Sequence, residues 1–172
     1  MATNSILIGG RFSSVKTLLA GFRFDAQLST TPQTKSVITS RVNPFTGGTG
    51  SKWFWKCAQH KFPDNEVKSD AQAFAEATKA LHNLSQDTPG LIQYTDWKKK
   101  LTTDQDATYL VAVDTESQSH KSASLAAAGL STVKNDMYLE YQLAAAGSYD
   151  VQVFVHTDNW LTIRDGLIII ED

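Results

Sequence analysis

The chain has 172 residues, with 16 lysines and arginines against 18 aspartates and glutamates, so its formal charge at pH 7 is −2. This length predicts one domain, and a content of 41% hydrophobic and 20% charged residues is typical of a globular protein, which excludes a disordered or fibrous chain. The near-neutral charge lacks the basic excess of proteins that bind duplex nucleic acid, so we do not expect direct nucleic-acid binding.

Strand patterns separated by turn residues fill the first part of the chain. β-Branched and aromatic residues predict strands at residues 6–8, 15–24, 35–40 and 52–59. Gly21 interrupts the second of these, where a bulge would fit. In the last, Trp53, Trp55 and Cys57 share one face, and Phe62-Pro63-Asp64 is expected to end the region with a turn.

One segment, near residues 69–85, has the pattern of an amphipathic helix. Ser69-Asp70-Ala71-Gln72 has the form of a capping box, in which the Ser and Gln side chains satisfy backbone N–H groups of the first turn. Apolar residues at helical spacing follow at Phe74, Ala77, Leu81 and Leu84. The helix is expected to end before Pro89-Gly90 and to cover one end or flank of a sheet.

The second half of the chain returns to strand patterns. Strands are expected at residues 91–94, 109–115, 137–143, 149–156, 160–164 and 167–171. Asp165-Gly166 joins the last two as a hairpin, because glycine tolerates a positive φ. Strands in this number with one inserted helix predict an all-β fold, namely a single jelly-roll β-sandwich or barrel of about eight strands over residues 1–172.

Patterns of catalytic and metal-binding residues are missing from the sequence. The four histidines are far apart and form no pair at ligand spacing: His60, His82, His120 and His156. No Gly-x-Ser-x-Gly elbow occurs, and the glycine-rich residues 47–50 precede an aromatic strand rather than the helix of a phosphate-binding loop. We therefore expect no enzyme activity, no catalytic residue, no metal, no cofactor and no small-molecule substrate.

The sequence also bears on the cellular compartment. Cys57 is the only cysteine, so no intrachain disulfide and no cysteine-based metal cluster can form, and we interpret it as a small core residue. The N-terminal residues lack a basic segment, and no stretch approaches 18 apolar residues, so neither a signal peptide nor a membrane span is expected. These features are typical of a protein kept in a reducing cytosol.

The tryptophans are the most informative side chains. Trp53, Trp55 and Trp97 are candidate core residues or candidate contacts between subunits, because large aromatic residues dominate both cores and interfaces. Phe54 makes its strand apolar on both faces, which is typical of a strand covered on both sides. The second cover could come from the helix that begins at Ser69 or from another copy of the protein.

Several stretches resemble a known family. Residues 151–156 (VQVFVH) and 160–167 (WLTIRDGL) resemble the last strands of viral major capsid proteins of the double jelly-roll lineage, of the polinton-like, virophage and adintovirus type. Similar features occur upstream in the same order, at residues 21–24, 53–55, 62–63, 73–84 and 129–132. Members of the lineage carry two barrels, so this chain is expected to be a single-barrel capsid subunit or one domain of a longer chain.

The resemblance implies a structural capsid protein whose upright barrels assemble side by side into an icosahedral shell. Its partners would be other copies of itself and other capsid proteins, and its location would be the virion, after assembly in the host cytoplasm or nucleus. A carbohydrate- or receptor-binding β-sandwich is the alternative, since tryptophan and tyrosine also stack on sugar rings. Asp158-Asn159-Trp160 is the one place that fits this alternative.

Overall fold

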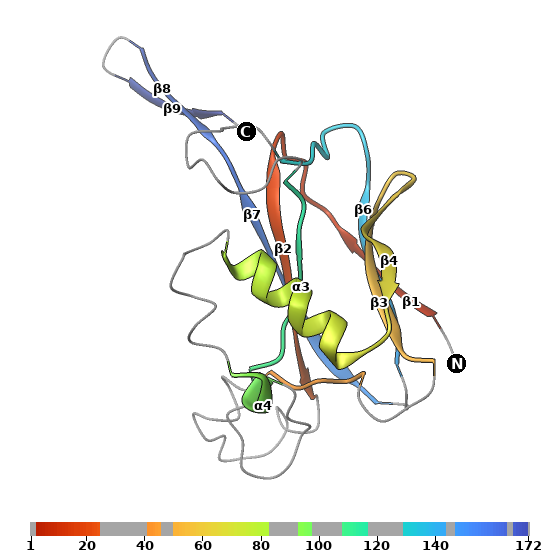
Figure 1. Cartoon of the computed structure of the whole chain (residues 1–172). Coiled ribbons are helices and arrows are strands. Elements are labelled where there is room, and N and C mark those ends of the chain that lie inside the picture. Colours follow the sequence, from red (N-terminus) through yellow and green to blue (C-terminus); the bar gives the residue numbers. More distant parts are fainter. Residues whose placement is uncertain are drawn as a thin grey trace.

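The computed structural model describes residues 3–24, 41–45, 50–82, 93–97, 108–116, 129–143, 147–164 and 167–171. Within these ranges the chain forms a β-sandwich of two antiparallel sheets with one longer helix, α3 (Asp70–His82), and one helical turn, α4 (Tyr94–Trp97) (Figure 1). The predicted all-β sandwich with one inserted helix is therefore confirmed.

The strands fall into two sheets and a separate hairpin. The first sheet has the order β1 (Thr3–Ile8), β6 (Met137–Gln142), β3 (Lys52–Cys57) and β4 (His60–Val67). The second has the order β5 (Val111–Asp114), β2 (Val15–Phe24) and β7 (Tyr149–Thr157), and β8 (Trp160–Arg164) pairs with β9 (Leu167–Glu171). Every successive pair from β1 to β7 except β3 and β4 changes sheet, which is the kind of interleaved connectivity found in jelly rolls.

The core lies between the two sheets and follows the two-residue period of the strands. On β2, Leu18, Ala20 and Phe22 have no exposed surface. The Phe22 ring lies edge-on to Phe45 and Tyr141, each at a centroid distance of 5.4 Å. Aromatic edge-to-face contacts thus join the two sheets at the centre of the sandwich.

Helix α3 begins where its sequence predicts. The Gln72 N–H donates to Ser69 Oγ over 3.3 Å, and the Gln72 side-chain oxygen accepts from the Lys68 N–H over 3.1 Å, one residue before the capping-box position. Its buried stripe differs from the expected one, because Phe74 is half-buried and Leu84 lies outside the described residues. Small side chains form most of that stripe, which lets the helix pack close to β5: Ala73, Ala77, Ala80 and Leu81.

The expected turn at Phe62-Pro63-Asp64 is wrong, because these residues lie inside β4. The chain instead turns at Ala58 and Gln59, where Ala58 has a φ of 53°. β4 is an edge strand, so proline, which cannot donate a hydrogen bond, is tolerated there. The register passes from Trp55↔Phe62 to Trp53↔Val67, so the extra β4 residues bulge.

The expected bulge at Gly21 is also wrong, since the register of β2 shifts between Val15 and Thr17. A Cβ at Gly21 would lie 2.6 Å from Arg41 Cδ. Glycine here makes room for the Arg41 side chain, whose guanidinium donates to the Gln152 side-chain oxygen over 2.6 Å. Arg41 therefore crosses β2 over Gly21 and reaches β7.

Two other expected strands have a different outcome. The strand at residues 35–40 lies outside the described residues. Of the strand expected at residues 91–94, only Gln93 and Tyr94 are described. The prediction is wrong there, because a helical turn begins at Tyr94. The Trp97 N–H donates to the Gln93 carbonyl over 2.9 Å, which closes that turn.

Candidate functional site

The three candidate tryptophans are buried within this single chain. Trp53, Trp55 and Trp97 are at most 1% exposed and belong to one hydrophobic cluster. The Trp97 ring lies 4.5 Å from the Tyr109 ring and 5.3 Å from the Phe74 ring, so α4, α3 and the segment before β5 meet there. Side chains without exposed surface offer nothing for a second copy to contact, so the three act as core residues.

The outer face of β3 is covered by its own chain. Phe54 is 6% exposed, and Lys61 Nζ lies 4.5 Å from the centroid of its ring. A lysine over an aromatic face is attracted by the ring quadrupole while its methylene stem excludes water. This contact comes from the neighbouring strand β4, a source of cover that the sequence analysis does not anticipate.

Cys57 lies in the core of the sandwich. Cys57 is 2% exposed, and burial raises the pKa of its thiol, which keeps the thiol protonated and agrees with a core role. Among the residues that the structure describes, no three histidine, cysteine, aspartate or glutamate side chains are placed to hold a metal ion.

A cleft of about 550 Å³ lies between β4, α3 and the end of β5. Phe62, Pro63 and Leu130 give the walls apolar surface. The walls also carry four carboxylates and one lysine: Asp64, Glu76, Asp114, Glu116 and Lys79. This excess of negative charge favours cationic over anionic groups. Glu116 already binds Lys16, and Glu76 lies 3.9 Å from Lys79, so part of that charge is balanced internally.

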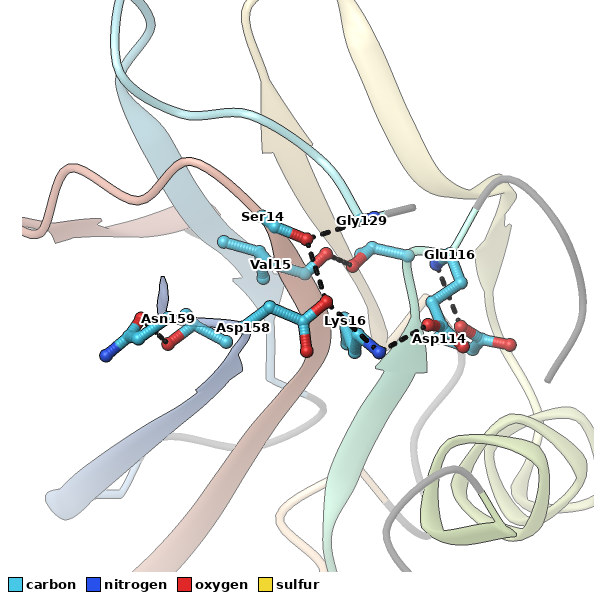
Figure 2. A network of polar contacts seen from close by, with 10 residues as sticks. Ser14, Val15, Lys16, Asp114, Glu116, Gly129, Asp158 and Asn159 are labelled. Atoms are coloured by element: carbon cyan, nitrogen blue, oxygen red, sulfur yellow. Dashed lines mark hydrogen bonds and ion pairs between the residues drawn. The ribbon is translucent and has the colours of Figure 1, made fainter. Parts of the chain in front are cut away.

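A network of polar contacts at one end of the second sheet joins β2, β5 and β7 (Figure 2). Lys16 Nζ lies 3.1 Å from Asp158 Oδ2 and 3.3 Å from Glu116 Oε1, and the Glu116 side chain is 8% exposed. Ser14 Oγ donates to Asp158 over 3.4 Å and accepts from the Gly129 N–H over 3.2 Å. Residues 100 or more positions apart are thereby held together at the point where the chain leaves β7.

The pKa of Lys16 reflects this network. Burial by itself lowers that pKa, but the hydrogen bonds and charges of Asp158 and Glu116 outweigh burial, so the pKa lies above the ordinary value of 10.5. Lys16 is therefore charged at neutral pH, and it separates two carboxylates that would otherwise repel each other.

We expect Lys16→Met to lower the free energy of unfolding by about 1–3 kcal/mol, because two partly buried carboxylates lose their shared cation. Chemical denaturation followed by circular dichroism measures the change. Lys79→Met is the matched control: that side chain is 58% exposed and 3.9 Å from Glu76, so its loss should cost less than about 1 kcal/mol. Equal effects of the two variants would contradict a stabilising role for the Lys16 network.

The Asp158-Asn159-Trp160 segment is engaged in contacts within the chain. The Asp158 carboxylate binds Lys16 and Ser14, and the backbone N–H of Asp158 donates to the Ser14 carbonyl over 3.1 Å. Asn159 Oδ1 accepts from Thr157 Oγ1 over 3.3 Å. The acidic group that would bind sugar hydroxyls in a carbohydrate-binding module is thus committed to holding the end of β7.

The two flanks of the sandwich differ in how they are covered. β4 and β5 are in contact at one flank, and α3, which follows β4, packs on β5 and crosses the near side of the sandwich in Figure 1. Val111, Ala112 and Val113 of β5 are consequently at most 1% exposed. Since β4 and β5 lie at this closed flank, the opposite edge strands of the two sheets, β1 and β7, lie towards the other.

We call the flank formed by β1 and β7 the open flank. Its inward-facing residues pack on the core but are only partly buried: Ile6, Ile8, Val151, Val153 and Val155. Leu7 is 56% exposed and Phe154 is 52% exposed on the same two strands. Sequence periodicity predicts both strands, but it cannot show that they lie at the edges of the sheets that the described residues form.

Comparisons with known proteins return nothing: no protein-family model matches the sequence, and neither a curated protein nor a solved structure matches it. In the described part of the chain, no helix combines the length and apolar character needed to cross a membrane. A function must therefore be inferred from the residues and geometry of this chain.

Proposed function

We propose that the protein is a structural subunit whose copies assemble side by side, and specifically a single-barrel viral capsid protein located in the virion. The observation that supports this proposal is the open flank, where core residues remain half-buried while α3 closes the opposite flank. The resemblance of residues 151–156 and 160–167 to capsid proteins supports a shell as the kind of assembly.

The edge strands differ in a way that favours pairing at the open flank. Exposed edges of soluble proteins are usually protected by charged residues, proline or bulges. β4 has all of these, with Lys61, Pro63 and Glu66 in a bulged strand. β1 (TNSILI) has no charged residue, and on β7 Asp150 is bound to Arg23 at 2.6 Å. β1 and β7 therefore lack the protection that β4 has, which favours pairing of these two edges with another chain.

Burying the apolar side chains of β1 and β7 would contribute favourably to the free energy of association. Completing the burial of a half-exposed leucine or phenylalanine contributes on the order of 1 kcal/mol. Five core side chains on β1 and β7 are incompletely buried, and Leu7 and Phe154, which alternate with them and point to the outer faces of these strands, are half-exposed. An interface that covers the whole flank would thus gain several such contributions, which favours association of copies.

The test is the oligomeric state of the purified chain, measured by size-exclusion chromatography with light scattering and by negative-stain electron microscopy. We expect oligomers, hexagonal plates or shells. Phe154→Asp should shift the protein towards monomers without changing its circular dichroism spectrum. The matched control is Val133→Asp, since Val133 is 51% exposed but lies in the turn before β6. A strict monomer that binds members of a glycan panel would contradict the capsid proposal and favour the carbohydrate-binding alternative.

A further inference from the structure

We propose that strand β9 of one copy pairs with the free edge of β7 in a second copy, so that an exchanged β8–β9 hairpin covers the open flank. This inference rests on the proposed assembly function, and it names the segment that makes the contact. It follows from two features of the described residues, a hairpin whose strands pair with no other described strand and a sheet that ends at β7.

The β8–β9 hairpin is the first of these features. Its strands pair only with each other within the described residues, from Trp160↔Glu171 to Arg164↔Leu167. Figure 1 shows the hairpin extending beyond the end of β7, away from the two sheets. A two-stranded hairpin is marginally stable in water and needs a third strand or a packing surface. Pairing with a further strand would therefore stabilise the hairpin.

The sequence of β9 indicates what kind of partner this is. Leu167-Ile168-Ile169-Ile170 are four successive apolar residues, so the sequence shows no alternation between apolar and polar positions. Strands of this composition are typical of a sheet that is covered on both sides, and uncharged edges pair readily with other strands. The composition of β9 therefore suits a strand that pairs with a sheet edge and also contacts a hydrophobic core. The edge of the second sheet beside the open flank offers both.

Strand β7 is the receiving edge. It pairs with β2 over its length, and the described residues place no strand on its other side. Among the described strands the second sheet has three against four in the first, so one added strand would equalise them and cover the partly buried valines of β7. Addition of a strand to an exposed edge is a common mode of protein recognition, in which main-chain hydrogen bonds supply affinity.

The exit from β7 explains why the hairpin reaches a second copy rather than its own β7. Two residues separate β7 from β8, and the first of them is Asp158. The backbone N–H of Asp158 donates to the Ser14 carbonyl over 3.1 Å, and the Asp158 carboxylate binds Lys16 over 3.1 Å. These contacts hold the chain to β2 as it leaves β7, so the hairpin continues outward instead of folding back along the edge of β7.

Disulfide trapping between two different variants tests the exchange. One preparation carries Phe154→Cys on β7, and the other carries Ile168→Cys or Ile169→Cys on β9, so that either register is sampled. Mild oxidation of the mixture should give a disulfide-linked heterodimer that neither preparation forms alone. Lys79→Cys replaces Phe154→Cys as the control on the closed flank and should give no link; the buried native Cys57 stays in every chain.

The outcomes separate this inference from the proposed function. A heterodimer that depends on both cysteines supports exchange, and light scattering then shows whether it closes as a dimer or continues as a ring. Oligomers without a link between β7 and β9 would overturn the exchange and leave assembly through another surface. A monomer without any link would overturn both proposals. Ile169→Lys in the full chain adds a second readout, since exchange predicts that it reduces oligomers as strongly as Phe154→Asp does.

Discussion

Trp55→Ala is expected to lower the free energy of unfolding by about 3–5 kcal/mol, the range observed when a large aromatic side chain is removed from a packed core. The Trp55 side chain has no exposed surface and belongs to the hydrophobic cluster that both sheets share. Its loss removes apolar burial and leaves a cavity that the strands on either side cannot fill. Urea denaturation followed by far-ultraviolet circular dichroism measures the change.

Two controls make this prediction specific. Trp55→Phe keeps most of the buried apolar surface and should cost clearly less than Trp55→Ala. Tyr94→Ala removes an aromatic side chain that is 37% exposed, so the cost should be smaller again. If Trp55→Ala unfolded at the denaturant concentration of the wild type, the indole could not be a core residue, and the interface interpretation of the tryptophans would return.

Gly129→Ala is expected to destabilise the fold by about 3 kcal/mol, at the upper end of what overpacking usually costs. A Cβ at position 129 would lie 2.3 Å from the Val15 carbonyl oxygen and 2.6 Å from its carbon, both of them backbone atoms. The chain cannot move away easily, because Val15 and Leu130 exchange backbone hydrogen bonds of 2.8 and 2.7 Å. Thermal unfolding and urea denaturation both report the loss.

Gly21→Ala is the matched control for this substitution. The added Cβ would lie 2.6 Å from Arg41 Cδ, which belongs to a flexible side chain that can shift. Alanine also restricts the unfolded chain more than glycine does, which offsets part of the cost, so the net change should stay below about 1 kcal/mol. A larger loss for Gly21→Ala than for Gly129→Ala would show that the close approach of residue 129 to β2 is described wrongly.

Features of the fold that depend on neighbouring residues could be predicted from the sequence. The period-two pattern of residues 149–156 predicted β7, and the Ser69 and Gln72 pair predicted the start of α3. Local geometry alone determines these elements, because alternating side chains and a capping residue act within a few positions. The prediction of a turn at residues 62–64 was wrong because proline also occurs in edge strands. Only the order of strands in the sheet shows that β4 is an edge strand.

The candidate interface could be predicted only in part. Residues 160–164 and 167–171 were predicted as a hairpin, and the structure pairs them antiparallel. The tryptophans were left open between core and interface, because residue type does not show which face of a strand another sheet will cover. The exposed residues on the outer faces of β1 and β7, Leu7 and Phe154, were not singled out, since nothing in the sequence marks a strand as the edge of its sheet.

The sequence by itself therefore determined the all-β class, the amphipathic helix α3 and the apolar C-terminal hairpin, because each results from the order of adjacent residues. Only the tertiary structure decided that α3 closes one flank and that β1 and β7 leave the other open. It also placed Lys16 between Glu116 and Asp158, 100 and 142 positions further along the chain. Contacts at such separations depend on which strands become neighbours, and that is settled by the packing of two whole sheets.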